Sequence, residues 1–467
     1  MHRRISHKWR ELVLGAPFLV PGLGLLLGFG LMPILLAAYM SLHRWKPVKG
    51  KFLGFSQYEK ALGDLGGALF FLIALFILIG ATWVIVQDWR RPRNWRLVAL
   101  VLALTSSLSV ASVVRAFRLE AFIEAYRLNE TWAVDLSTKV FPDRYGDPMV
   151  QLDILSSQVG SGFGAAAILT LACGIVFFGQ FTKIKSKTMV RVGGGIMIFG
   201  SLQAASVNWS SMTAAGDQDF LRSLINTVFY SAGTVSLQIS LGLLIAFALY
   251  RKIRGFGAFR FLIFLPYVTP VVAMASVFSL IFGARESSLS NQILTKLGID
   301  PLVWIADRTP IAHYLFGTEI TGLLAGPSVG MLTAIVFGVW SYTGYNAVIL
   351  LAGLTAIPAD LYEAAELEGA TLWQTFRYIT MPLLSPVIFF LVITGLIGTF
   401  QAFTHIYVML GNTVNETLHT GSIEIWRQIS LGKFGYSSAL AVILFILILV
   451  LTISQFALLG RRQHFGN

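Results

Sequence analysis

The sequence predicts an all-α protein that crosses a membrane several times. Of the 467 residues, 55% are hydrophobic and 12% are charged, whereas charged residues make up about a quarter of an ordinary soluble domain. The mean hydropathy is +0.72. Apolar windows also recur along the chain, each close to the roughly 20 residues that a helix needs to cross the hydrocarbon layer. A polytopic helical membrane protein is therefore expected.

The apolar windows predict about ten spans. The first follows a basic start and has no small-residue cleavage site after a short core, so we expect an uncleaved first span. The fourth and fifth windows are the shortest. The ten windows are 12–42, 68–86, 97–114, 163–178, 192–207, 221–250, 261–282, 329–354, 387–407 and 438–459.

Lys and Arg gather at the ends of these windows, and their positions predict the orientation. Short cytoplasmic loops carry an excess of these residues. With ten spans, the basic clusters at 3–10, 90–96, 183–191, 251–260 and 461–462 all fall on one side, and only the cluster within 44–60 falls on the other. Both termini are therefore expected in the cytoplasm. The net charge of +12 is a topology signal and indicates no nucleic-acid partner.

A polar segment between the eighth and ninth windows, YEAAELEGATLWQTFRYITMP, carries a distinct pattern. Asp360, with Glu363 three residues later, is expected to cap a first helix, and Gly369 is expected to end it. Thr371 and Gln374 are spaced as a capping box for a second helix. The charge count places this segment in the cytoplasm.

Prolines and small residues complete this segment. Pro382 and Pro386 are expected to end its second helix and to restart the chain as the ninth span. The small side chains of Ala364, Ala365 and Ala370 permit close approach of another surface. The alternative is an ordinary cytoplasmic connector, but the spacing favours a docking element.

The segment resembles the EAA loop of ABC-importer permeases, the cytoplasmic element that docks on the transporter's ATPase. The resemblance rests on the spacing from Glu363 through Gly369 to Ile379 and Pro382. It implies a separate ATP-hydrolysing partner, with Glu363 in a polar contact across that interface. The residues implied in coupling are Glu363, Ala364, Ala365, Gly369, Ala370 and Pro382.

The resemblance extends to maltose-type permeases of the carbohydrate-importer branch. Residues 52–64, FLGFSQYEKALGD, and 220–230, FLRSLINTVFY, look like two motifs that are nearly adjacent in that family, but here roughly 150 residues separate them, enough for an independent folding unit. We expect an N-terminal span and external segment at 1–64, an insertion at 65–216 and a permease core at 217–467 that contains the loop at 358–382. The insertion would hold four extra spans and an external loop at 115–161, added to a six-span core as a peripheral scaffold.

An aromatic and polar cluster in the eighth window is a candidate for holding a sugar. Trp340, Ser341, Tyr342, Tyr345 and Asn346 lie close together there. Ring faces cover the apolar C–H surface of a sugar, while hydroxyls and amides take its hydrogen bonds. An interfacial aromatic belt is the alternative.

The ninth window carries small and polar residues at helical spacing. Thr394, Gly398, Gln401 and His405 share one predicted face, although such residues also serve helix packing. His405 is expected to be a hydrogen-bonded residue rather than a metal ligand or proton relay. Resemblance to the maltose-type permeases implies sugar contacts at several of these positions, some of which are Gly or Ala here. The predicted pathway comprises Ser341, Tyr342, Tyr345, Gly398, Thr399, Gln401 and Ala402.

Several chemistries are excluded by the sequence. No G-x-x-x-x-G-K-[ST] phosphate cradle occurs, so ATP-driven transport needs a partner's ATPase. The single cysteine, Cys173, excludes disulfides within the chain and cysteine-cluster metal sites. Seven histidines are scattered along the chain, so no enzyme site, metal or cofactor is expected. An ion- or proton-coupled secondary transporter is the alternative, but it needs ionisable residues inside the membrane, and the windows are almost free of Asp and Glu.

The residues and the resemblance together predict a transport subunit of an ATP-driven ABC importer. It would be a multi-pass protein of the cell (inner) membrane, surrounded by lipid. Its cargo would be a carbohydrate, an oligosaccharide or a sugar derivative, delivered by an external binding protein. The resemblance implies two ATPase subunits and a second permease subunit as partners.

Overall fold

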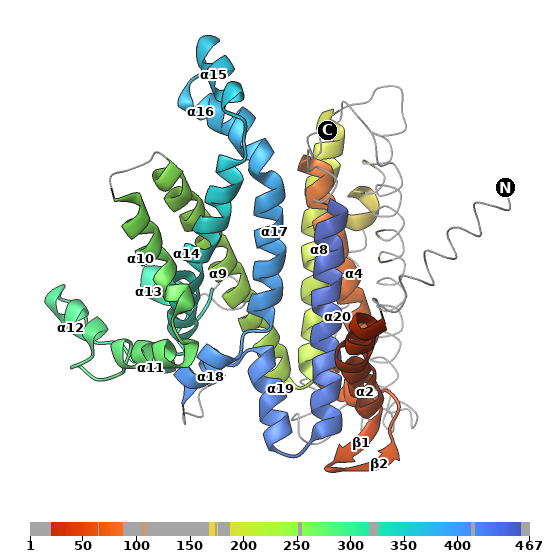
Figure 1. Cartoon of the computed structure of the whole chain (residues 1–467). Helices are drawn as coiled ribbons and strands as arrows, with labels where there is room; N and C mark the ends of the chain where they lie inside the picture. Colours follow the sequence, from red (N-terminus) through yellow and green to blue (C-terminus); the bar gives the residue numbers. More distant parts are fainter. Residues whose placement is uncertain are drawn as a thin grey trace.

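The computed structural model is almost entirely helical, as predicted (Figure 1). It describes residues 20–63, 65–86, 187–250, 255–316, 326–411 and 416–458, with Thr105, Leu108, 168–172 and Ile175. Within these residues, 5 helices are long and apolar enough to cross a membrane, or up to 7 if each bent helix pair is one span. Most of the predicted windows at 97–114 and 163–178, and the loop at 115–161, lie outside the described residues.

Three long helices form the centre of the bundle. They are α9 (Gln218–Tyr250), α14 (Val329–Thr355) and α17 (Met381–Phe400). Glycines allow α9 and α14 to approach closely, since a Cβ on Gly338 would lie 2.7 Å from Thr234 Cγ2. Ser328 caps α14, and its hydroxyl accepts from Met331 N–H at 3.1 Å. Small residues at helix contacts are typical of membrane bundles.

The window predicted as a continuous seventh span is bent. It consists of α10 (Phe256–Val268) and α11 (Val271–Ile281), which meet at 91°. Thr269 between them is extended, with φ −69° and ψ 145°. It precedes Pro270, which disfavours helical backbone at the residue before it. The seventh window, 261–282, therefore contains two helices, and the hydropathy pattern did not indicate the break between them.

A two-stranded hairpin lies at the end of the bundle opposite α15 and α16 (Figure 1). Strands β1 (His43–Lys46) and β2 (Val48–Phe52) pair antiparallel, followed by α3 (Ser56–Leu62). Gln57 Nε2 donates to His43 O at 2.6 Å. The basic cluster that disagreed with the orientation rule forms this hairpin, which the all-α prediction missed.

A buried asparagine holds together the segment between α11 and α14. Asn291, on α12 (Leu289–Lys296), is fully buried. Its Oδ1 accepts from Trp304 Nε1 at 2.7 Å and from Leu302 N–H at 3.0 Å. This clamp fixes the short helix η3 (Trp304–Ala306), which is followed by α13 (Ile311–Phe316) and then by α14.

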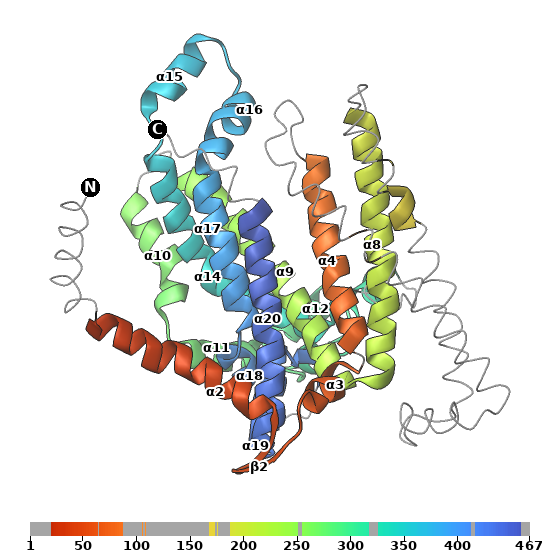
Figure 2. The same ribbon diagram turned by 90° about the vertical axis from the view of Figure 1, so that its right-hand side faces the viewer.

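Among the described residues, the region predicted as an insertion includes two paired helices, α4 (Leu65–Val86) and α8 (Lys187–Ala215). Ile77 and Met197 are buried in a cluster of their own beside the central bundle (Figure 2). The remaining elements are η1 (Leu26–Leu31), α2 (Met32–Ser41), α15 (Ala359–Leu367), α16 (Leu372–Thr375), η5 (Phe376–Thr380), α18 (Thr404–Leu410), η6 (Glu416–Leu418), α19 (Gly421–Ser430) and α20 (Phe434–Leu458).

Candidate functional site

The loop at 358–382 projects beyond one end of the bundle as two short helices, α15 and α16 (Figures 1 and 2). Pro358, not Asp360, occupies the N-cap of α15, and Asp360 lies in its first turn. Proline lacks a backbone N–H and is extended here, so the helix begins directly after it. The predicted Asp360 cap was therefore wrong.

Gly369 turns the chain between the two helices. Its φ of +74° lies in the left-handed region that favours glycine. Ala370 N–H donates to Ala365 O and Gly369 N–H to Glu366 O, both at 2.9 Å. These two bonds form a Schellman motif, which satisfies carbonyls at the end of α15. The predicted break at Gly369 is confirmed.

The second helix starts as predicted but does not end as predicted. Thr371 and Gln374 form the capping box, in which Thr371 N–H donates to Gln374 Oε1 at 2.7 Å. The helix then runs unbroken from Leu372 to Phe400. Pro382 lies in the first turn of α17, directly after the π-helical turn η5. This wider turn rearranges the backbone hydrogen bonds, so Pro382 continues the helix instead of ending it.

The loop presents apolar side chains to its surroundings. Leu367 is 90% exposed, Leu372 79% and Trp373 66%. Large apolar groups gathered on one projecting element mark an interaction surface. The sequence analysis did not select these three residues. Of the predicted coupling residues, Glu363, Ala364, Gly369 and Pro382 are exposed, while Ala365 and Ala370 are half-buried.

Side-chain contacts tie the loop to the central helices. The hydroxyl groups of Tyr362 and Thr380 lie 3.2 Å apart and join α15 to the base of α17. Phe376 packs its ring edge against Phe247 of α9, with centroids 5.2 Å apart, and Trp373 contacts Phe376 at 5.5 Å. A force on the loop would therefore reach both α9 and α17.

A cavity of about 420 Å³ lies among α9, α10, α14, α17 and α18. Its volume is within the range of small-molecule sites. Ser341 is buried and is not part of the described lining. The predicted pathway residues that do line the cavity are Tyr342, Tyr345, Gly398, Thr399, Gln401 and Ala402.

The ninth span is shorter than predicted, and this change shapes the cavity. Helix α17 ends at Phe400, and α18 begins at Thr404. The expected single helical face over 387–407 was wrong, because the backbone at Phe403, with φ −134°, departs from helical geometry. His405 still reaches the lining from α18 and is hydrogen-bonded to Tyr230 OH at 2.8 Å.

Three tyrosines form one wall of the cavity. Tyr267 of α10 stacks on Tyr345 with centroids 4.7 Å apart and meets Tyr342 edge-on at 5.8 Å. Aromatic faces of this kind suit the C–H surface of a sugar ring. The sequence analysis selected the two tyrosines of α14 but missed Tyr267, which the bend at Pro270 brings to them.

The cavity lining contains no Asp, Glu, Lys or Arg among the described residues. Its polar groups are hydroxyls, amides and one imidazole. Two amide residues, Gln238 of α9 and Asn346 of α14, are only 4% and 3% exposed. Asn346 belonged to the predicted aromatic and polar cluster. Gln238 was missed, although a glutamine inside an apolar window is unusual enough to indicate a functional residue.

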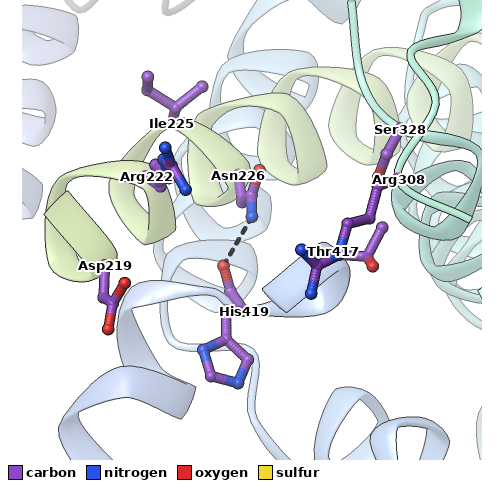
Figure 3. Close-up of a pocket in the computed structure, with 8 residues that line it drawn as sticks. All are labelled: Asp219, Arg222, Ile225, Asn226, Arg308, Ser328, Thr417 and His419. Carbon is purple, nitrogen blue, oxygen red and sulfur yellow. Dashed lines mark hydrogen bonds between the residues drawn. The ribbon is translucent and has the colours of Figure 1, made fainter. Parts of the chain in front are cut away.

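A second hollow, of about 270 Å³, lies at the other end of α9 and is strongly polar (Figure 3). Arg222 and Asn226 reach it from α9, Arg308 from the loop before α14, and His419 from the segment after η6. Asn226 Nδ2 donates to His419 O at 3.0 Å. This hollow therefore presents charged groups where the cavity presents none.

Beside this hollow, Arg427 of α19 joins two carboxylates. Its Nη2 donates to Asp219 Oδ2 at 2.7 Å, and its Nε forms an ion pair of 2.7 Å with the fully buried Glu424. Burial raises the pKa of Glu424, although its bonds to Arg427 and Gln428 act in the opposite direction. Among the described residues, no three His, Cys, Asp or Glu side chains gather as a metal site.

A helical membrane bundle with a projecting two-helix loop and an uncharged internal cavity has the architecture of a solute permease. Comparison with known proteins specifies which kind. The chain belongs to the family described as "Binding-protein-dependent transport system inner membrane component", whose model matches residues 238–464, and within it to the carbohydrate-uptake permeases of type I ABC importers.

Several of the similar curated proteins are named as sugar permeases. The chain is 33% identical to the trehalose/maltose transport system permease protein MalF of Thermococcus litoralis, over 50% of this chain and 73% of that protein. It is 30% identical to the arabinooligosaccharides transport system permease protein AraP of Bacillus subtilis, over 55% and 77%. It is 32% identical to the lactose transport system permease protein LacF of Rhizobium radiobacter, over 51% and 76%.

Proposed function

We propose that this chain moves a carbohydrate, delivered by an external binding protein, through the cavity and that residues 358–382 dock on the importer's ATPase. The observation that carries the docking proposal is the projecting loop, with Leu367, Leu372 and Trp373 exposed around the turn at Gly369. A rigid apolar knob fits a cleft on another subunit. Its contacts with α9 and α17, which line the cavity, support conversion of ATPase movement into helix movement.

The arrangement along the bundle supports the proposed topology. The loop lies at one end, and the hairpin and α19 lie at the other (Figure 1), as does the start of α9, which lines the charged hollow of Figure 3. With the loop in the cytoplasm of an inner-membrane protein, both termini are cytoplasmic in a ten-span chain. The charged groups of this hollow then face the side from which the binding protein arrives.

The cavity favours an importer of sugars over a secondary transporter. Proton- and ion-coupled carriers rely on ionisable residues inside the membrane, and the described lining holds none of the four charged residue types. Three tyrosine rings beside amides and hydroxyls match the mixed apolar and polar surface of a sugar. Three of the similar proteins are named for trehalose and maltose, for arabinooligosaccharides and for lactose, which supports an oligosaccharide cargo.

An uncovered helix supports the proposal of a second permease subunit. None of the apolar window in the helix Val20–Ser41 is buried, and its start leads away from the bundle (Figure 2). Lipid or another subunit must cover it. With two permeases, each loop would contact one of two ATPase subunits.

We further propose that residues 65–216 are an insertion beside the six-span core formed by 1–64 and 217–467. Its two ends meet, because a Cβ on Gly216 would lie 2.9 Å from Gly63 N. Asp217 N–H also donates to Lys60 O at 3.1 Å. The chain therefore re-enters the core where it left it. The separate packing of α4 and α8 supports a peripheral scaffold.

Joining Gly63 directly to Asp217 tests the scaffold proposal. We expect the shortened chain to assemble with its partners and to keep the same order of preference among transported sugars. Native-gel assembly and uptake by the complete importer measure both properties. A shortened chain that assembles but loses its substrate preference would refute a purely peripheral role.

Co-purification tests the proposed function as a whole. The tagged full chain, expressed with its genomic neighbours and extracted in mild detergent, is expected to bring down an ATPase subunit and a second permease. Vesicles containing this complex should take up sugar only with ATP and the binding protein. Recovery of a chain that transports sugar without any ATPase would instead favour the secondary transporter.

A further inference from the structure

Two buried amide side chains line the cavity with unsatisfied polar atoms. They are Gln238, in the middle of α9, and Asn346, on the facing side of α14. Within the described residues, neither Gln238 Oε1 nor Asn346 Nδ2 has a hydrogen-bond partner. Buried polar atoms are nearly always paired, so two orphans in one cavity need an explanation.

Four other polar side chains of the cavity already have partners. Thr394 and Thr399 donate their hydroxyls to the carbonyls of their own helix, both at 2.8 Å. Tyr230 and His405 are hydrogen-bonded to each other. The two amides therefore differ from their neighbours in holding free hydrogen-bonding capacity.

Glycines on the facing helices make room for the amides. A Cβ on Gly395 of α17 would lie 3.2 Å from Gln238 Nε2, and one on Gly242 of α9 would lie 3.0 Å from Asn346 Cβ. Gly395 thus leaves space for the Gln238 amide, and Gly242 allows α9 to approach α14 beside Asn346. The packing keeps both amides at the lining.

A carbonyl oxygen that lacks a donor and an amide N–H that lacks an acceptor complement a single hydroxyl group. A hydroxyl donates one hydrogen bond and accepts others, so it can satisfy both atoms at once. A 180° turn of either amide exchanges its oxygen and its nitrogen. The side chain still carries one acceptor atom and one donor group, so it can still bond a hydroxyl. A charged group is disfavoured, because burying a carboxylate or phosphate without a counter-charge is costly.

We propose that Gln238 and Asn346 hold one hydroxyl of a neutral sugar unit during transport. Asn346 Nδ2–H donates to the hydroxyl oxygen, and the hydroxyl donates to Gln238 Oε1. The tyrosine wall of Tyr267, Tyr342 and Tyr345 covers the ring. This assignment rests on the proposed function and adds to it the residues that select a neutral cargo.

Uptake by the complete importer in proteoliposomes tests this assignment. The probes are radiolabelled trehalose, maltose, lactose and arabinotriose, with a digalacturonate as the charged comparison. Sugar uptake and ATP hydrolysis are measured together for the wild type, Gln238→Leu, Asn346→Leu and the double variant. Ser236→Ala, at an exposed position of the same helix, is the matched control.

We expect each single variant to lower the uptake of the preferred neutral sugar per ATP hydrolysed about 5- to 30-fold, because the hydroxyl of the cargo then loses one of its two hydrogen-bond partners. Uptake per ATP hydrolysed in the double variant should be no lower than in the more impaired single variant, because both residues contact the same hydroxyl. Thermal stability of the empty chain should be unchanged or raised, because leucine removes an orphaned polar atom. A merely structural role would lower it.

Three results would overturn the assignment. They are unchanged uptake in both single variants, losses that multiply in the double variant, and a wild type that prefers digalacturonate. A wild type that hydrolyses ATP but takes up none of the sugars would instead reject the carbohydrate function on which the assignment rests. If Asn346→Leu fails to assemble, Asn346→Ser, which keeps a donor, should retain part of the uptake.

Discussion

The loop at 358–382 and the cavity have opposite surfaces, and the contrast fits what each is proposed to contact. The loop lies outside the bundle and exposes large apolar groups such as Leu367 and Trp373. The cavity lies within the membrane bundle and lines itself with amides, hydroxyls and tyrosines. Apolar groups in water favour a protein partner, whereas polar groups within an apolar bundle favour a polar cargo. Helices α9 and α17 connect the two.

Among the predicted variants, Trp373→Ala should have the largest effect. Buried tryptophans dominate protein interfaces, and their loss costs about 2 kcal/mol or more, so we expect at least about 30-fold weaker association with the ATPase. Pull-down with titrated ATPase measures it. Leu297→Ser is the control, because Leu297 is also exposed, at 68%, but lies at the end of α12 and not in the loop. Equal loss in both variants would contradict a specific docking surface.

Gly369→Val should have the next largest effect, through the backbone alone. A Cβ at this position has open space, but the φ of +74° is unfavourable for a β-branched residue by about 1–2 kcal/mol. We expect sugar uptake and ATP hydrolysis to fall together by roughly tenfold. Gly369→Asn is the control, because asparagine tolerates this conformation. Normal transport by the valine variant would show that the turn does not transmit force.

Glu424→Gln should give the smallest effect, and the effect should depend on pH. Its folded-state pKa is raised by burial, so the folded state binds this proton more tightly than the unfolded state. The resulting stability is present below the unfolded pKa of about 4.3 and is lost as the pH rises through the folded pKa. We expect the thermal stability of wild type relative to Glu424→Gln to fall as the pH rises above about 4.3. A constant difference would contradict the shift.

The sequence predicted best where structure is local. The capping box of Thr371 and Gln374 and the turn at Gly369 need only neighbouring residues, and both are present. The windows also located the long helices, since length and hydropathy are local properties. Family resemblance then linked the loop to ABC importers, and the family match confirms it.

Bends and cavity groups were harder to predict because they depend on packing between distant segments. Hydropathy alone does not distinguish a straight span from the broken pairs at Pro270 and at Phe403. Gln238 and Asn346 line the same cavity from positions 108 residues apart, and no local pattern relates them. The hairpin at 43–52 was missed because its basic residues were interpreted only as a topology signal.

The ratio of sugar taken up to ATP hydrolysed tests most directly whether the loop drives the cavity. It is measured in proteoliposomes of the complete importer, for the wild type, Gly369→Val and Gln238→Leu. The account predicts that Gly369→Val lowers both rates and leaves their ratio near the wild-type value, whereas Gln238→Leu keeps ATP hydrolysis and lowers the ratio. The opposite pattern, with the ratio lost in Gly369→Val and kept in Gln238→Leu, would contradict it.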